Sequence, residues 1–346
     1  MPRTRTVRVA LFKGPRQPLA IEHVPLPDPG AGEVLMKVAR CGICGTDLHA
    51  TEGDHPTAAC NSRLGHEYAG EVVAVGSSVS RLKEGDRITA MPVGGCGNCD
   101  ACHSGMYIFC EARIYHRGGF GEYLIVKEAL ALKLPSTVSL EEGALVEPLA
   151  VAHHALRYAG DKRPKRILIL GAGPVGLSVL VWLKRLGIGT VVVVSRSRRR
   201  AALALAIGAD GFVLDGPDAV NEVREALAGS PELVFECIGM PGAIGAAIRH
   251  VCARGHIIAL GFCHLPDSFI PSAALAKGIS IQFSITYDLS DFQRCIDAFD
   301  AGWLDPTSFI TSTISLEALP QCFEALRAGA PETKVLVNPW LAETTA

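Results

Sequence analysis

Residues 166–187 read RILILGAGPVGLSVLVWLKRLG: an apolar run of strand length, a glycine turn and an apolar stretch of helical length. The turn places G-x-G-x-x-G at Gly171, Gly173 and Gly176, and the apolar run VVVV follows at 191–194. Glycines in this order between a strand and a helix, with another strand about 20 residues on, are typical of a dinucleotide-binding βαβ unit. The alternative is a structural glycine turn in another parallel sheet, and the full strand–turn–helix–strand context favours the dinucleotide site.

Each glycine of the turn has a physical role. The first permits the tight turn, the second lets the backbone approach a pyrophosphate, and the third lets the helix pack on the strand. The free N–H groups at the helix N-terminus then face the phosphates. We therefore expect the dinucleotide to contact Gly171, Gly173, Pro174, Val175 and Gly176.

The end of the second strand bears on the choice between NADP(H) and NAD(H). NAD sites usually place an acidic residue there to bind the ribose 2′-hydroxyl, whereas SRSRRR at 195–200 contains none. Ser195 occupies the acidic position, and the guanidinium groups of Arg196 and Arg200 suit a 2′-phosphate, with Arg199 as a further candidate. The sequence therefore predicts NADP(H) rather than NAD(H). The alternative is that these arginines are only the solvated start of a helix.

The regions on either side of the glycine turn differ in composition and in the secondary structure that they predict. Up to about residue 148 the chain is rich in Gly and Pro. The short apolar runs VRVALF, EVLMKVA, EYAGEVVAVG, DRITAM and GEYLIV predict a largely β region there. From about residue 165 strands alternate with helical segments, which indicates a parallel sheet with crossover connections. After about residue 289 we expect helices and a final apolar run, KVLVNP.

Bulk properties exclude several classes of function. The chain has 346 residues, enough for two domains, and its net charge of −2 gives no reason to expect a nucleic-acid partner. The longest apolar runs are too short to span a bilayer and the N-terminus lacks a signal-peptide core, so we expect a cytoplasmic protein without a membrane partner. There, the 12 cysteines are expected to be metal ligands or buried apolar residues rather than disulfides.

One cysteine cluster has the spacing of a closed zinc site. GGCGNCDACHSGMYIFC places four cysteines at C-x2-C-x2-C-x7-C, namely Cys96, Cys99, Cys102 and Cys110. Four thiolates at such spacing suit a tetrahedral structural zinc. An iron–sulfur cluster is the alternative, but bacterial cluster runs have a short last gap followed by proline, and Glu111 follows here. We predict a structural zinc lobe at residues 94–111, which holds a segment with few apolar residues of its own.

A second set of ligand-type residues is spread over three segments, CGICGTDLH, LGHEYAGEV and LVEPLAVAHHA. Cys44, His66 and a carboxylate, with Glu67 and Glu147 as the candidates, could form a zinc site that leaves one position for water or substrate. Such an open site suits alcohol chemistry, because zinc lowers the pKa of a bound alcohol and stabilises the alkoxide.

Neighbouring residues suit the same chemistry. Thr46 could pass on the alcohol proton, His49 could take it towards solvent, and Asp47 could orient a metal ligand. The alternatives are a redox cysteine pair, which lacks a thioredoxin-like context, a buried structural Cys41, and a core His66 without metal.

With these motifs the chain resembles the zinc-dependent medium-chain dehydrogenase/reductase superfamily, in its sorbitol-dehydrogenase-like branch. The motifs occur in the family's order over nearly the whole length: CGICGTDLH, LGHEYAGEV, the four-cysteine lobe, GGFGEYLIV, EPLAVAHHA, GAGPVG, FECIG and KVLVNP. The resemblance implies an α/β fold with two parts. A GroES-like, partly β-barrel catalytic domain would comprise residues 1–148 and 289–346, and a Rossmann domain with a doubly wound parallel sheet would comprise residues 149–288. It also implies a homodimer or homotetramer formed through the edge of the Rossmann sheet.

The resemblance also assigns roles around the open metal site. It implies that Cys44, not Cys41, is a ligand of the catalytic zinc and that His66 is the second. The sorbitol-like branch has a glutamate at the position of Glu147, while Glu67 can also bind zinc, so these two carboxylates compete or exchange. Thr46 and His49 match the family's proton relay.

Two departures from the family pattern bear on the substrate pocket. The segment CEARIYHRG, from Cys110 to Gly118, is shorter than we expect, which would reshape or open the pocket. Arg63 stands where relatives usually carry an apolar residue; it is either exposed or available to a polar or anionic substrate.

The sequence thus predicts an NADP(H)-dependent oxidoreductase with one catalytic and one structural zinc per chain. Its small-molecule substrate would be a secondary alcohol, a polyol or a ketone. One alternative is an NAD-dependent polyol or amino-alcohol dehydrogenase. Another is a catalytically silent nucleotide-binding homologue, against which the full set of candidate ligands and relay residues argues. A zinc-free quinone reductase is disfavoured because that branch lacks both metal sites.

Overall fold

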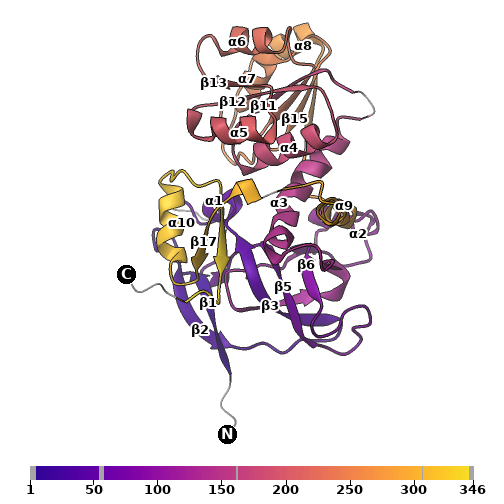
Figure 1. Ribbon diagram of the computed structural model, residues 1–346, viewed down its shortest axis with the longest axis vertical. Coiled ribbons are helices and arrows are strands. Elements are labelled where there is room, and N and C mark those ends of the chain that lie inside the picture. The colour runs from indigo at the N-terminus through magenta and orange to yellow at the C-terminus, as the bar shows by residue number, and fades with distance from the viewer. Residues whose placement is uncertain (1–4, 54–57, 161–162, 306, 343–346) are drawn as a thin grey trace. The chain divides into compact units, whose positions relative to one another are not determined.

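The computed structural model describes residues 5–53, 58–160, 163–305 and 307–342. The chain divides into two compact units (Figure 1). Unit 1 comprises Met1–Glu147 and Asp288–Ala346, and unit 2 comprises Pro148–Tyr287. Helix α3 (Leu140–Arg157) passes from one unit into the other, and Pro148, which has no amide hydrogen to donate, lies inside it.

Unit 1 is built mainly of β-strands. Its largest sheet has the strand order β10 (Ala131–Lys133), β6 (Arg87–Ala90), β5 (Glu67–Val75), β3 (Glu33–Gly42), β18 (Lys334–Asn338) and β17 (Ile310–Ser315), with β9 (Tyr123–Lys127) also paired to β3. A smaller sheet has the order β2 (Ala20–Pro25), β1 (Thr6–Phe12) and β4 (Ser62–Arg63). The five apolar runs expected to be strands in this region correspond to β1, β3, β5, β6 and β9.

The C-terminal segment completes the large sheet of unit 1. Strand β18 pairs antiparallel with β3 and parallel with β17, so the run KVLVN lies beside a strand from the N-terminal part of the chain. Val335, Leu336 and Val337 are almost fully buried. The helices of this unit are α1 (Gly45–Ala50), α2 (Asp100–His103), α9 (Leu289–Asp300), α10 (Leu319–Arg327) and the short η1 (Tyr107–Phe109), η2 (Glu128–Leu130) and η4 (Thr307–Phe309).

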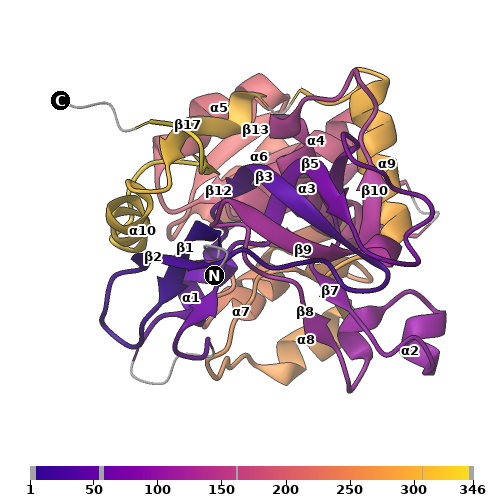
Figure 2. The ribbon, with the colours of Figure 1, turned by 90° about the horizontal axis from the view of Figure 1, so that it is seen from below.

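A small lobe stands at the side of the sheet of unit 1 (Figure 2). It contains the two-stranded ladder of β7 (Val93–Gly94) and β8 (Ile114–Tyr115), together with α2 and η1. Ile114 and Tyr115 are half-exposed, so this lobe buries little apolar surface of its own.

Unit 2 is a doubly wound α/β structure. Its sheet has the order β13 (Gly211–Leu214), β12 (Thr190–Ser195), β11 (Arg166–Leu170), β14 (Leu233–Glu236), β15 (His256–Ala259) and β16 (Ser280–Phe283), and all of these pairings are parallel. The chain runs outwards in both directions from β11 and β14, so the topological switch point lies between these two strands.

Helices cover both faces of this sheet (Figure 1). Those on one face are α4 (Pro174–Arg185) and α5 (Ala201–Ile207), the latter preceded by η3 (Arg198–Arg200), and those on the other are α6 (Ala219–Ala226), α7 (Ala243–His250) and α8 (Pro271–Lys277). The strands are buried on both faces, which explains their continuous apolar runs. Among the described residues we find no helix with the length and apolar character needed to cross a membrane.

Candidate functional site

Three ligand-type side chains from separate segments meet in unit 1. Cys44 is the N-cap residue of α1, directly after β3, while His66 and Glu67 lie at the start of β5. The pairing of β3 with β5 places Gly42 opposite Glu67, which brings the two segments together. One ligand atom each from Cys44, His66 and Glu67 lies within 4.8 Å of the others. Sulfur, imidazole nitrogen and carboxylate oxygen are the donors that zinc takes in proteins, so this group fits a zinc ion.

Asp47 fixes the orientation of this group from the first turn of α1. Its Oδ1 lies 3.2 Å from His66 Nδ1 and accepts a hydrogen bond from the Gly65 amide, also at 3.2 Å. Its Oδ2 accepts from the Cys44 amide at 3.3 Å. Burial alone would raise the pKa of Asp47, but the charge of His66 and these hydrogen bonds lower it. Because His66 Nδ1 is engaged, its Nε2 is the nitrogen left for a metal.

Glu67 is held by a lysine that the sequence analysis did not single out. Lys334 Nζ lies 2.6 Å from each Glu67 carboxylate oxygen and donates to the Ile43 carbonyl at 3.2 Å. The side chains of Lys334 and Glu67 are 3% and 0% exposed, so this is a buried ion pair. A Cβ on Gly42 would lie 2.0 Å from Glu67 Oε2, so only glycine leaves room for this carboxylate. The signal in the sequence was a lysine opening the apolar run KVLVNP.

Glu147, the other predicted carboxylate, is buried in α3 and lies outside the group of Cys44, His66 and Glu67. It lies near enough to Lys334 for charge interaction. Burial lowers the pKa of the Lys334 ammonium, and the charges of Glu67, Cys44 and Glu147 raise it to a net increase. One ammonium therefore interacts electrostatically with three of the four predicted ligands of the open site.

Thr46 and His49 lie on the same short helix as this group. The Thr46 amide donates to Cys44 Sγ at 3.5 Å, so the residue adjoins the sulfur ligand. His49 is exposed and its Nδ1 lies 3.2 Å from Glu52 Oε2. The structure thus places one predicted relay residue beside the ligand group and the other at the surface.

The four-cysteine cluster comes together in the lobe of unit 1, as its spacing predicted. The sulfurs of Cys96, Cys99, Cys102 and Cys110 lie within 4.8 Å of one another. Cys102 Sγ is 3.6 Å from Cys99 Sγ and 3.9 Å from Cys96 Sγ. Zinc bonded to four sulfurs at about 2.3 Å separates neighbouring sulfurs by about 3.8 Å, so the spacing fits a zinc ion. The Asn98 amide donates to Cys96 Sγ, which lowers the pKa of this thiol to about 7.

The glycine turn in unit 2 has the geometry that its sequence implies. Gly171 has φ +104°, a conformation that side chains disfavour. A Cβ on Gly176 would lie 2.0 Å from the Gly171 carbonyl oxygen, so the helix can pack this closely only with glycine. A Cβ on Gly173 would meet no atom within 4 Å, so space for an approaching ligand is open there. Pro174 and Val175 form the first turn of α4.

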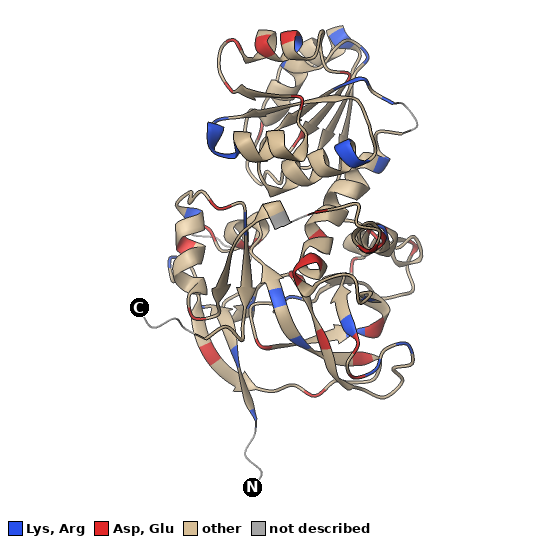
Figure 3. Ribbon diagram, in the orientation of Figure 1, with Lys and Arg blue, Asp and Glu red and all other residues tan. Residues whose placement is uncertain are grey.

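The basic segment after β12 adjoins this turn. Ser195 is the last residue of β12 and is half-buried, whereas Arg196 is exposed. Arg200 Nη1 donates to the Ala172 carbonyl at 3.4 Å, which brings its guanidinium next to the glycine turn. Lys and Arg gather where β12 leads into α5, while elsewhere both signs of charge are interspersed over each unit (Figure 3).

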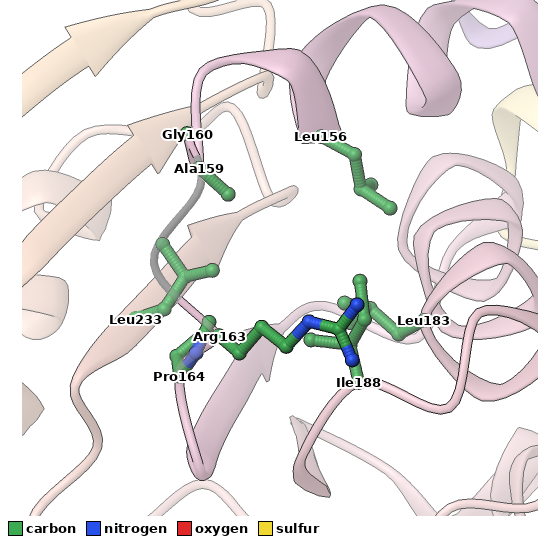
Figure 4. Close-up of a pocket in the computed structure, with 8 residues that line it drawn as sticks. All are labelled: Leu156, Ala159, Gly160, Arg163, Pro164, Leu183, Ile188 and Leu233. Atoms are coloured by element: carbon green, nitrogen blue, oxygen red, sulfur yellow. The ribbon is translucent and has the colours of Figure 1, made fainter.

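A separate pocket of about 330 Å³ opens in unit 2 at the amino ends of the central strands of its sheet (Figure 4). It is lined mostly by apolar residues, with one arginine: Leu156, Ala159, Gly160, Arg163, Pro164, Leu183, Ile188 and Leu233. Pro164 and Leu233 lie at the amino ends of β11 and β14, whereas the glycine turn follows the carboxyl end of β11. This pocket is therefore distinct from the predicted dinucleotide site.

Comparison with known proteins places the chain among dehydrogenases. Residues 30–136 match the family model of the alcohol dehydrogenase GroES-like domain, and residues 174–301 match that of the zinc-binding dehydrogenases. The chain is 32% identical over 342 residues to (R,R)-butanediol dehydrogenase of Bacillus subtilis (strain 168), covering 93% of this chain and 96% of that protein. It is 35% identical over 323 residues to sorbitol dehydrogenase of Homo sapiens, covering 90% of each.

A solved structure shares the fold over nearly the whole chain. It is described as that of a zinc-binding dehydrogenase from Sinorhizobium meliloti 1021 bound to NADP. The TM-score is 0.88 at 30% sequence identity, covering 97% of this chain and 100% of the other. The α/β fold class predicted from the sequence, with a GroES-like domain and a doubly wound parallel sheet, is confirmed.

Proposed function

The chain belongs to the zinc-dependent medium-chain dehydrogenase/reductase family, in its sorbitol-dehydrogenase-like branch, and we propose that it transfers a hydride between NADP(H) and a secondary alcohol, polyol or ketone. The observation that carries the proposal is the meeting of Cys44, His66 and Glu67 in unit 1 of a chain whose unit 2 carries the glycine turn.

Cys44 and His66 would hold the catalytic zinc in this proposal. Zinc bound there supplies a Lewis acid that polarises an alcohol or carbonyl oxygen. Glu67 is drawn towards Lys334 by two contacts of 2.6 Å, so it serves as a carboxylate that exchanges between the ammonium and the metal site. Glu147 is the second acidic group available to the site.

Proton movement is assigned to two residues of α1. Thr46 adjoins the Cys44 sulfur and would accept the proton of the substrate hydroxyl through its own hydroxyl group. His49 is exposed and would exchange that proton with solvent. In the reverse direction the same two groups return a proton to the oxygen of the reduced ketone.

The preference for NADP(H) rests on the end of β12. No acidic side chain stands at Ser195, and Arg196 is exposed and able to turn towards a 2′-phosphate. Arg200 adjoins the glycine turn through its hydrogen bond to the Ala172 carbonyl. A bidentate guanidinium contact recognises phosphate strongly, whereas a carboxylate at the same place would repel it.

The cofactor assignment is tested by Arg196→Asp, with Arg185→Asp at the exposed C-terminal end of α4 as the matched charge control. We expect Arg196→Asp to weaken NADP⁺ binding about tenfold or more while leaving NAD⁺ binding unchanged or improved. Arg185→Asp should change neither. Unaltered NADP⁺ affinity in Arg196→Asp would refute the assignment based on Arg196, and wild-type protein that binds NAD⁺ more tightly would assign the chain to NAD(H) instead.

We also propose a homodimer or homotetramer in which the free edge of β16 forms a subunit interface. This strand pairs with β15 on one side and has no other partner among the described residues. Several apolar side chains beside it are exposed: Ile270 (69%), Leu275 (81%), Phe283 (68%) and Ile285 (42%). Such an apolar edge is normally covered. Light scattering should give two or four times the chain mass for wild type and a smaller species for Phe283→Asp; a wild-type monomer would contradict the proposal.

A further inference from the structure

Glu236, the last residue of β14, carries a buried carboxylate that the proposed chemistry does not use. It is 2% exposed and has no ion pair with lysine or arginine among the residues that the structure describes. Its Oε1 accepts hydrogen bonds from the amides of Ile238 at 2.6 Å and Gly239 at 2.9 Å. The carboxylate therefore folds the segment 237–239, part of the motif FECIG, back onto the end of its own strand.

This segment lies at the switch point of the sheet, where open α/β folds bind their ligands. The Cys237 amide donates to the Leu170 carbonyl at 2.8 Å. A Cβ on Gly171 would lie 3.0 Å from the Cys237 carbonyl oxygen, so the segment touches the first glycine of the turn. Residues 237–239 thus lie directly beside the glycine turn.

The backbone of Glu236 also holds the next loop. The amides of Leu260 and Gly261 donate to the Glu236 carbonyl oxygen at 2.8 and 3.0 Å. A Cβ on Gly261 would lie 2.6 Å from Glu236 Oε2 and 2.2 Å from the Gly239 nitrogen. The loops after β14 and β15 therefore pack on each other around this side chain, without space for another atom.

We propose that Glu236 is a positioning residue for the dinucleotide: its carboxylate holds the loop after β14, on which the loop after β15 packs, in the conformation that adjoins the glycine turn and leaves the space at Gly173 open. The inference rests on the proposed dinucleotide-dependent function. A charged acceptor makes hydrogen bonds about twice as strong as a neutral one, so a neutral side chain would hold the two amides less firmly. If the open conformation is populated only in part, the measured affinity for the dinucleotide falls by the same fraction.

The test compares Glu236→Gln with Glu225→Gln, which removes the same charge from the exposed face of α6 in the same unit. NADPH is titrated into the full-length, zinc-loaded protein, and its dissociation constant is read from the nicotinamide fluorescence. We expect Glu236→Gln to raise this constant about tenfold and Glu225→Gln to leave it unchanged. Hydrogen exchange of the Ile238 and Gly239 amides should be faster in Glu236→Gln than in the other two proteins.

Several outcomes would overturn the proposal. Equal NADPH affinity in Glu236→Gln and wild type would do so, as would a lowered unfolding temperature with unchanged affinity, since that result describes a merely structural residue. Should Glu236→Gln fail to fold, Gly261→Ala pushes the same two loops apart and is expected to weaken NADPH binding in the same way. Wild-type protein that binds neither NADPH nor NADH would refute the proposed function itself, whereas tight wild-type binding with a normal Glu236→Gln refutes only the role of Glu236.

Discussion

Adding one methyl group at two glycines of the same turn should change the stability of the dinucleotide-free protein in opposite directions. In Gly176→Ala the new Cβ would lie 2.0 Å from the Gly171 carbonyl oxygen, whereas ordinary carbon–oxygen contacts begin at about 3.3 Å. The start of α4 must therefore shift by about 1.3 Å, and overpacking of this kind costs about 1–3 kcal/mol of the free energy of unfolding.

In Gly173→Ala the new Cβ meets nothing within 4 Å, and the backbone at φ −75°, ψ 176° suits alanine. Alanine restricts the unfolded chain, so the dinucleotide-free protein should gain about 0.4–1 kcal/mol. The methyl group nevertheless stands where the pyrophosphate would approach the backbone, so dinucleotide affinity should fall by about 100-fold or more.

The assay pairs thermal unfolding of the dinucleotide-free, zinc-loaded protein with titration of NADPH. Gly173→Ala should unfold at the wild-type temperature or a few degrees higher and bind NADPH poorly. Gly176→Ala should unfold several degrees lower and also bind poorly. If Gly173→Ala bound NADPH like wild type, the placement of the dinucleotide at this turn would be refuted. If it lost as much stability as Gly176→Ala, the packing argument for Gly173 would be wrong.

Other predictions concern the two metal sites and one buried histidine. Replacing Lys334 by methionine leaves the Glu67 carboxylate buried without its ammonium. Urea unfolding of the zinc-loaded protein should then show a loss of about 3–5 kcal/mol in the free energy of unfolding, which Lys334→Arg should largely avoid. Equal urea midpoints for all three proteins would contradict this. Wild-type protein should contain two zinc ions per chain, and Cys110→Ser should lose the one in the lobe while keeping the one at Cys44 and His66; a metal assay that finds both ions in Cys110→Ser would exclude the lobe as a zinc site. Burial lowers the pKa of His250 to about 4 from 6.5, so the unfolded state binds the proton more readily than the folded state. The free energy of unfolding should therefore fall by up to about 3 kcal/mol as pH drops from about 6.5 towards 4. Thermal unfolding of His250→Phe should show a smaller fall with pH, and parallel curves for the two proteins would count against this explanation.

The alternating strands and helices of unit 2 could be predicted from the sequence because their signals are local. RILIL and VVVV coincide with β11 and the core of β12, since strands buried on both faces need continuous apolar runs. Strand β17 was missed because ITSTIS alternates exposed and half-buried positions and contains no long apolar run. Its pairing with β18 depends on contacts that no single segment shows.

The candidate site likewise contains residues that the sequence predicts and residues that it does not. The cluster of four cysteines could be assembled from spacing alone, because its ligands lie within one short segment. Lys334 could not, because its partner Glu67 lies 267 residues away in the sequence and the two meet only through the pairing of β18 and β5 with β3. The role of Glu236 could likewise not be predicted from the motif FECIG, since it depends on the loop after β15.

The central claim is that Cys44 and His66 hold a zinc ion used for NADP-dependent oxidation of an alcohol. The most direct measurement follows the absorbance of NADPH formed from NADP⁺ by the zinc-loaded protein with a panel of secondary alcohols, polyols and cyclic alcohols. We predict that at least one alcohol produces NADPH in wild type and that Cys44→Ser, still folded and still binding NADPH, produces none. The claim is contradicted if wild type binds NADPH but no alcohol is oxidised, or if Cys44→Ser turns over at the wild-type rate.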